Sequence, residues 1–169
     1  QNCMLFEIYS GHPIVNNLGG GGFPSVEDMW DEILSSGKLI YGMAVDDAHK
    51  FSDPWDKTGA RPGQAWVMVR AKQLTAKNII SSLESGDFYA STGVELDSYE
   101  VNKKGIKISI KPGRWAKFRT LFIGKDGKVF KEAIANPATY EFQGSEMYIR
   151  AKIIDSNGNM AWTQPIIIE

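Results

Sequence analysis

The segment from Leu39 to Val45 is a continuous apolar run in which polar and apolar side chains do not alternate. A strand with one face in water alternates, so an uninterrupted run is typical of a strand covered on both faces, as in a parallel sheet. Ala65 to Ala71 is predicted to be a second buried strand, and Met4 to Tyr9 an earlier one. These three runs favour an α/β arrangement for the first half of the chain.

Two helices are predicted between these strands. Ser25 is a suitable N-cap for the first, and Gly37 a suitable stop. Between them, apolar side chains recur at helical spacing and predict one buried stripe: Val26, Met29, Trp30, Ile33 and Leu34. For the second helix, Thr75 is the expected N-cap and Gly86 the expected end.

After about Leu96 the helical periodicity disappears, and short apolar segments alternate with turn signals. Asp126-Gly127 and Asn157-Gly158 have the composition of two-residue hairpin turns, because both residue types accept positive φ. Six predicted strands over some seventy residues indicate a small antiparallel β-sandwich: 106–110, 119–123, 128–131, 139–142, 147–154 and 160–168. We therefore expect an α/β domain at residues 1–95 and a β-sandwich domain at residues 96–169.

Composition narrows the functional classes. The chain has 43% hydrophobic residues and a net charge of -1, so it can bury a core, and it shows no basic patch of the kind that binds nucleic acid. The single cysteine, Cys3, allows no internal disulfide. No apolar run approaches the roughly 20 residues that cross a bilayer. No signal-peptide pattern follows Gln1, and a strand is predicted almost at once, so we expect the chain to begin inside a larger fold.

Asp47 and His49 form a D-x-H pair directly after the apolar run that ends at Val45. Active sites of open α/β sheets and barrels lie at this end of the strands. Residues i and i+2 of an extended segment point to the same side, so a carboxylate and an imidazole there can share one divalent cation. Such ligands suit Zn, Mn or Fe. The structural alternative is an aspartate that caps a turn beside a surface histidine.

Other residues could complete or surround such a site. His12, in a Gly-His-Pro loop after the first predicted strand, could lie at the same rim or could bond to the backbone. Asp46 could support the metal ligands as a hydrogen-bond partner. Arg61, Ser91 and Thr92 could contact a phosphate, although an arginine there could equally be a solvated charge and the Ser-Thr pair part of a turn.

Three blocks of the sequence, in order, resemble PHP-domain proteins of the branch similar to metal-dependent phosphoesterases: Phe6–Pro13, Tyr41–His49 and Gly86–Gly93. The resemblance covers roughly residues 4–95. It implies a distorted (β/α)7 barrel, a cluster of histidines and carboxylates that binds up to three divalent metals, and hydrolysis of phosphate esters by metal-activated water. By this resemblance, Asp47 and His49 match the final D-x-H ligands of the family.

The family's opening H-x-H motif, its following histidines and its glutamate ligand have no counterpart in this chain. The expected fold class is therefore α+β, with a partial PHP-type (β/α) barrel segment followed by the β-sandwich. The implied partners are a small phosphorylated substrate and a missing N-terminal segment of the same protein. The metal site would be incompletely bound, and we expect the chain alone to be a poor phosphoesterase or none.

Two other readings stay open. In one, the chain is a non-catalytic binding module whose β-sandwich recognises a glycan or a protein partner, which exposed rings of Trp115, Tyr140 or Trp162 on one face would support. In the other, exposed strand edges pair with a second copy to form an oligomer.

Overall fold

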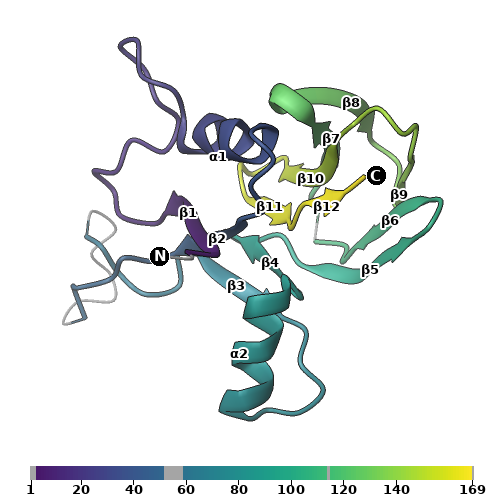
Figure 1. Ribbon diagram of the computed structural model, residues 1–169. Coiled ribbons are helices and arrows are strands. Elements are labelled where there is room, and N and C mark those ends of the chain that lie inside the picture. The colour runs from purple at the N-terminus through teal and green to yellow at the C-terminus, as the bar shows by residue number, and fades with distance from the viewer. Residues whose placement is uncertain (1–2, 52–58, 114, 169) are drawn as a thin grey trace.

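The computed structural model describes residues 3–51, 59–113 and 115–168. Strands predominate in these ranges, and two helices occur in them (Figure 1). The first part contains β1 (Leu5–Ser10), α1 (Val26–Ser35), β2 (Tyr41–Val45), β3 (Trp66–Val69), α2 (Ala76–Ser85) and β4 (Phe88–Ser91). The second contains β5 (Leu96–Asn102), β6 (Gly105–Ile110), β7 (Phe118–Gly124), η1 (Lys125–Gly127), β8 (Lys128–Ala133), β9 (Ala138–Glu141), β10 (Tyr148–Asp155), β11 (Met160–Thr163) and β12 (Ile166–Ile167).

The strands form three sheets. β1 and β2 are a parallel pair. The largest sheet runs in the order β3-β4-β11-β10-β7-β8, with β12 also paired to β10, and all its pairings are antiparallel. The third sheet is antiparallel, in the order β5-β6-β9.

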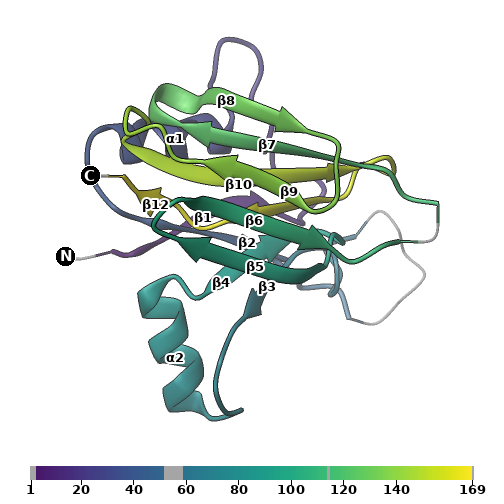
Figure 2. The ribbon, with the colours of Figure 1, turned by 90° about the vertical axis from the view of Figure 1, so that its right-hand side faces the viewer.

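The largest sheet lies between two cores, because side chains alternate along its strands. On one face, Ile149, Ala151 and Ile153 of β10 pack with apolar side chains of the β5-β6-β9 sheet. Figure 2 shows β5 and β6 running alongside β7 and β10. On the other face, Tyr148 and Trp162 pack with α1, β1 and β2. The molecule is therefore layered, with α1 and the parallel pair on one side of the main sheet and the small sheet on the other.

Local signals for both helices are confirmed. The Ser25 hydroxyl accepts a hydrogen bond from the Asp28 N–H, and the Asp28 carboxylate accepts one from the Ser25 N–H, each at 3.0 Å. This capping box fixes the start of α1. Thr75 caps α2, which ends at Gly86 with φ of 75°. A side chain at Gly86 would approach the Tyr41 ring to 2.5 Å, so glycine is required there on two grounds.

The prediction of a partial (β/α) barrel is wrong, and so is the α+β fold class that was based on it. The described residues form mainly antiparallel sheets. A barrel needs successive parallel strands joined by helical crossovers, but only β1 and β2 are parallel among the described strands. β3 is not a parallel strand, because it pairs antiparallel with β4. The apolar run 39–45 is covered by α1 instead: Ile40 and Ala44 share a core with Trp30 of α1, and a Cβ on Gly42 would lie 2.8 Å from the Trp30 ring.

The antiparallel strands expected after residue 96 are present, and they join a sheet that also contains β3 and β4. The expected division between residues 95 and 96 therefore separates strands of one sheet, because β4 lies before it, β11 lies after it, and the two strands pair. No helix in the described part of the chain has the length and apolar character to cross a membrane.

Candidate functional site

The parallel pair brings together two loops that are distant in sequence. Since β1 and β2 run in the same direction, the loops after Ser10 and Val45 leave from the same edge. The Gly11 N–H donates to the Val45 carbonyl at 2.7 Å, which extends the pairing past the end of β1. This edge carries His12 on one loop and Asp46, Asp47 and His49 on the other.

His12 and His49 meet at this edge. Their Nε2 atoms are 3.3 Å apart, and the two rings stack with centroids 4.9 Å apart and planes inclined by 23°. Two imidazole ligands of one tetrahedral zinc, each about 2.0–2.1 Å from the metal, have nitrogens about 3.3 Å apart. The separation of the two ring nitrogens therefore matches that of a shared metal ion.

The hydrogen bonds of the other ring nitrogens assign the tautomers. His49 Nδ1 lies 2.9 Å from the Asp47 carbonyl oxygen, an acceptor, so Nδ1 carries the proton and Nε2 keeps its lone pair. His12 Nδ1 accepts from the Ile14 N–H at 3.3 Å, so in the neutral ring Nε2 carries the proton and donates to His49. A cation could take the place of the proton between the two Nε2 atoms only after His12 changed tautomer. Its proton would then sit on Nδ1, and the 3.3 Å hydrogen bond from the Ile14 N–H would be lost.

Asp47 contacts the His49 ring through its backbone carbonyl. Its φ is 50°, in the left-handed region that aspartate tolerates, and its carbonyl oxygen orients the His49 ring. Within residues 3–51, 59–113 and 115–168, no three histidine, cysteine or carboxylate side chains gather at one point. The Asp47 carboxylate is thus not seen converging with the two rings, and its role as a metal ligand stays a prediction.

Asp46 anchors the neighbouring loop. Its carboxylate accepts backbone N–H bonds from Gly63, Gln64 and Ala65 at 2.9, 2.6 and 2.8 Å. The Ala60 carbonyl in the same loop accepts from the N–H groups of His49 and Lys50. These bonds hold residues 59–65 against the edge and keep the His49 backbone in place. Among the described residues, Asp46 therefore supports the imidazoles through the 59–65 loop, and no hydrogen bond joins its carboxylate to either ring.

The three expected phosphate contacts lie in different surroundings. Arg61 is half-buried in the loop that Asp46 holds. The buried Ser91 hydroxyl donates to the Val94 carbonyl at 2.7 Å and accepts from the Gly93 N–H at 2.9 Å. The Thr92 hydroxyl accepts from the Met160 N–H at 2.8 Å. The last two hydroxyls thus connect β4 to β11 and close a turn, and the structure does not bring them to the imidazole pair by any hydrogen bond among described residues.

Comparison with known proteins gives no assignment. No family model, no curated protein and no solved structure matches this chain. The resemblance to PHP-domain proteins is therefore a proposal that rests on the three sequence blocks.

Sequence reasoning missed a buried charge network between α1 and β10. Arg150 donates from Nε and Nη2 to the two Asp31 oxygens at 2.8 and 2.6 Å, and from Nη2 to Glu27 at 3.1 Å. Glu27 also accepts from Lys152 at 2.6 Å and from the Trp162 indole N–H at 3.0 Å. Burial disfavours the Glu27 carboxylate, but Arg150 and Lys152 outweigh this and hold its pKa below the usual value.

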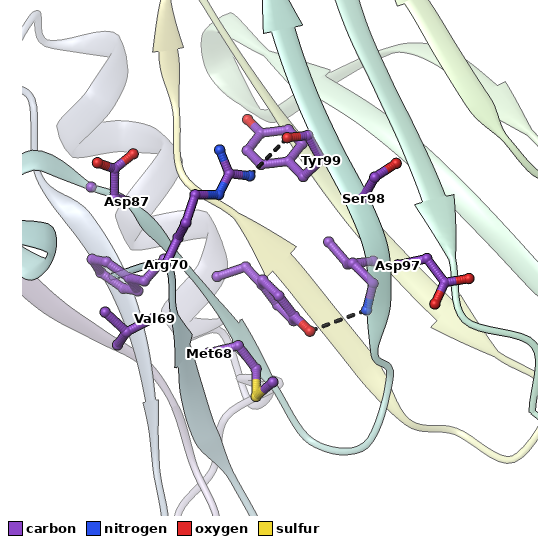
Figure 3. Close-up of a pocket in the computed structure, with 11 residues that line it drawn as sticks. Met68, Val69, Arg70, Asp87, Asp97, Ser98 and Tyr99 are labelled. Carbon is purple, nitrogen blue, oxygen red and sulfur yellow. Dashed lines mark hydrogen bonds between the residues drawn. The ribbon is translucent and has the colours of Figure 1, made fainter. Parts of the chain in front are cut away.

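A cavity of about 220 Å³ was also missed; it lies between β3, β4 and the edge of β5 (Figure 3). The Arg70 guanidinium donates to the Tyr99 carbonyl at 2.8 Å, and the Leu96 N–H donates to the Tyr89 hydroxyl at 3.1 Å. Burial raises the pKa of the Tyr99 phenol to about 12. No local sequence motif predicts this cavity, because its walls are formed by β3, β4 and β5, whose arrangement could not be predicted from the sequence.

Proposed function

We propose that the edge formed by His12 and His49 contributes two imidazole ligands to a divalent-metal site, and that this site serves the hydrolysis of a phosphate ester. One observation supports the proposal above all: the 3.3 Å separation of the two Nε2 atoms, which come from positions 37 residues apart. The resemblance of the three sequence blocks to metal-dependent phosphoesterases supplies the reaction class. A bound metal would supply an activated water and neutralise phosphoryl oxygens.

The chain's own residues have defined tasks in this proposal. His49 presents its Nε2 lone pair because the Asp47 carbonyl holds the proton on Nδ1. Asp46 fixes the loop that carries the Ala60 carbonyl, and so limits the movement of the His49 backbone. A catalytic site needs at least three protein ligands. The remaining donors must therefore come from outside the pair, and the segment that carries the rest of the family's ligands is the proposed source.

Titration with Co²⁺ tests the metal site without depending on activity, because bound cobalt gives visible absorption that reports imidazole ligation. We expect binding by the wild-type chain, and at least about tenfold weaker binding in His12→Ala and in His49→Ala, the size of a lost ligand or ligand support. Glu141→Gln, an exposed carboxylate on β9, is the matched control and should bind as the wild type does. Unchanged cobalt spectra in both histidine variants would refute the site.

A second assay separates metal binding from chemistry. Release of p-nitrophenol from p-nitrophenyl phosphate with Mn²⁺ or Zn²⁺ should be slow or absent for this chain, because two imidazoles do not complete a hydrolytic site. Robust turnover that disappears in Asp47→Ala would show instead that the carboxylate acts as a ligand and that the site is complete.

The alternative of an aromatic recognition surface has less support. Tyr140 and Trp162 are core residues, 2% and 1% exposed, and only Trp115 is exposed, at 87%. A sugar- or peptide-binding face built on these three rings is therefore not formed.

A further inference from the structure

A seam lies between the outer edges of β5 and β12, two strands that belong to different sheets. β5 is the outer strand of the small sheet, and among the described strands β12 pairs only with β10. A cavity of about 360 Å³ lies between them, lined by Tyr99 and Val101 of β5 and by residues 165–167 at β12. Pockets that hold ligands usually have volumes of about 300–1,000 Å³.

The backbone of β5 turns hydrogen-bonding groups toward this seam. In an antiparallel ladder, alternate residues point their N–H and C=O groups toward the partner and away from it. The Tyr99 carbonyl points away from β6, because it accepts from Arg70 across the cavity. Val101, two residues later, must then also point its N–H and C=O groups away from β6. Neither group has a hydrogen-bond partner among the described residues.

The backbone of β12 presents the same chemistry from the other side. The Ile168 N–H donates to the Met147 carbonyl, so residues 168 and 166 face β10. Ile167 between them must point its N–H and C=O groups away from β10, toward the cavity it lines. Val101 and Ile167 are 42% and 50% exposed, so an accessible apolar residue lies at each edge.

These edges define what can fill the seam. Unpaired strand groups on both sides are complementary to an extended backbone, which carries donors and acceptors on both of its edges. We propose that the seam between β5 and β12 binds an extended polypeptide segment of a partner protein, which adds a strand between the two sheets. Arg70 and Asp87, which both line this cavity and the neighbouring one, would lie against the side chains of that segment.

Variants that delete a single N–H test this proposal. Proline at an outward-facing edge position removes the donor without breaking the ladder on the other side. Val101→Pro should therefore keep the β5–β6 pairing, and Val101→Thr is the matched control that retains the N–H group. Ile167→Pro and Ile167→Thr form the same pair on β12. Protection of the Glu100 and Asn102 amides from hydrogen exchange shows whether β5 is intact in each variant.

The probe is a phage-displayed library of random linear decapeptides selected on the wild-type chain, followed by binding measurements with the enriched peptides made synthetically. We expect at least tenfold weaker binding to Val101→Pro and Ile167→Pro, unchanged binding to both threonine variants, and slowed exchange of the Val101 and Ile167 amides in the complex. The proposal fails if no peptide is enriched, or if enriched peptides bind the proline variants as tightly as the wild type. It also fails if both amides become protected with rising protein concentration alone, which would assign the seam to a second copy.

Discussion

The side-chain amide of Gln164 forms two hydrogen bonds with the backbone of Gly42, one in each direction. The Gly42 N–H donates to Gln164 Oε1 at 2.8 Å, and Gln164 Nε2 donates to the Gly42 carbonyl at 2.9 Å. A single side chain thus does for β2 what a neighbouring strand would do. It ties the parallel pair to the segment that follows β11, 122 residues away, and so satisfies groups that would otherwise be buried without partners.

Replacing this amide should destabilise the whole fold. Gln164→Leu removes both bonds and leaves a buried N–H and a buried C=O unsatisfied, so we expect a loss of about 2–5 kcal/mol in the free energy of unfolding. Urea denaturation followed by tryptophan fluorescence measures it. Gln73→Leu, which changes an exposed glutamine, should alter the free energy by less than about 0.5 kcal/mol. Equal effects of the two substitutions would contradict the role of Gln164.

Removing the buried guanidinium of Arg150 should lower the free energy of unfolding, because two buried carboxylates lose a partner. Arg150→Ala would leave Asp31 and Glu27 buried with less compensation, and loss of one partner of a buried pair costs about 3–5 kcal/mol. The control is Arg119→Ala, since Arg119 and Glu132 form an exposed pair at 3.9 Å that should contribute about 0–1 kcal/mol. Added salt should weaken the small effect at Arg119 and leave the large one nearly unchanged, which thermal or urea unfolding at two ionic strengths would show.

The sequence predicted what is encoded locally and failed where contacts are distant. Ser25, Thr75 and Gly86 were found because a cap is defined by residues within one turn. The Asp126-Gly127 turn was found for the same reason, and both residues have positive φ, 59° and 68°. An apolar run such as 39–45 indicates that a strand is buried, but it does not indicate which elements cover the strand. The pairing of β4 with β11, which decides the sheet, joins segments some seventy residues apart.

The candidate site shows the same limit. His12 and His49 were each noted, but an i, i+2 argument paired His49 with Asp47, its neighbour in sequence. The left-handed backbone at Asp47 breaks the extended geometry which that argument assumed. The partner that the fold supplies comes from the other loop of the parallel pair. His12 was expected either at the same rim or bonded to the backbone, and the parallel pairing of β1 with β2 brings it to His49.

Glycine at position 86 can be tested with one added methyl group. Gly86→Ala would place a Cβ about 2.5 Å from the Tyr41 ring at a φ of 75°, which is unfavourable for alanine. Strain and overpacking together should cost about 2–4 kcal/mol. The control is Gly63→Ala, which also has positive φ, 84°, but meets nothing within 4 Å, and should lose only about 1 kcal/mol. Similar melting temperatures for the two variants would show that the contact with Tyr41 contributes nothing.

Stability should also depend on the ionisation of Glu146, which is fully buried. Its carboxylate accepts from the Tyr140 hydroxyl and the Gln143 N–H on one oxygen, at 2.7 and 2.6 Å, and from the Ser145 N–H on the other, at 2.8 Å. Burial alone would raise the pKa of this group, but these donors outweigh burial and lower it below the usual 4.5. A lowered pKa in the folded state stabilises the protein above the unfolded-state value, and this contribution is lost as pH falls through the folded-state value.

The wild-type chain should therefore lose stability steadily from about pH 5 downward. Glu146→Gln should be less stable at neutral pH, by about 1–3 kcal/mol, because the amide presents a donor to groups that already donate. Its stability should also fall less steeply over the same acidic range. Urea midpoints measured from neutral pH down to about pH 3 would show both effects, with Glu141→Gln, an exposed carboxylate, as the control that keeps the wild-type slope. Parallel curves for the wild type and Glu146→Gln would mean that other carboxylates, such as Glu27, account for the acid sensitivity.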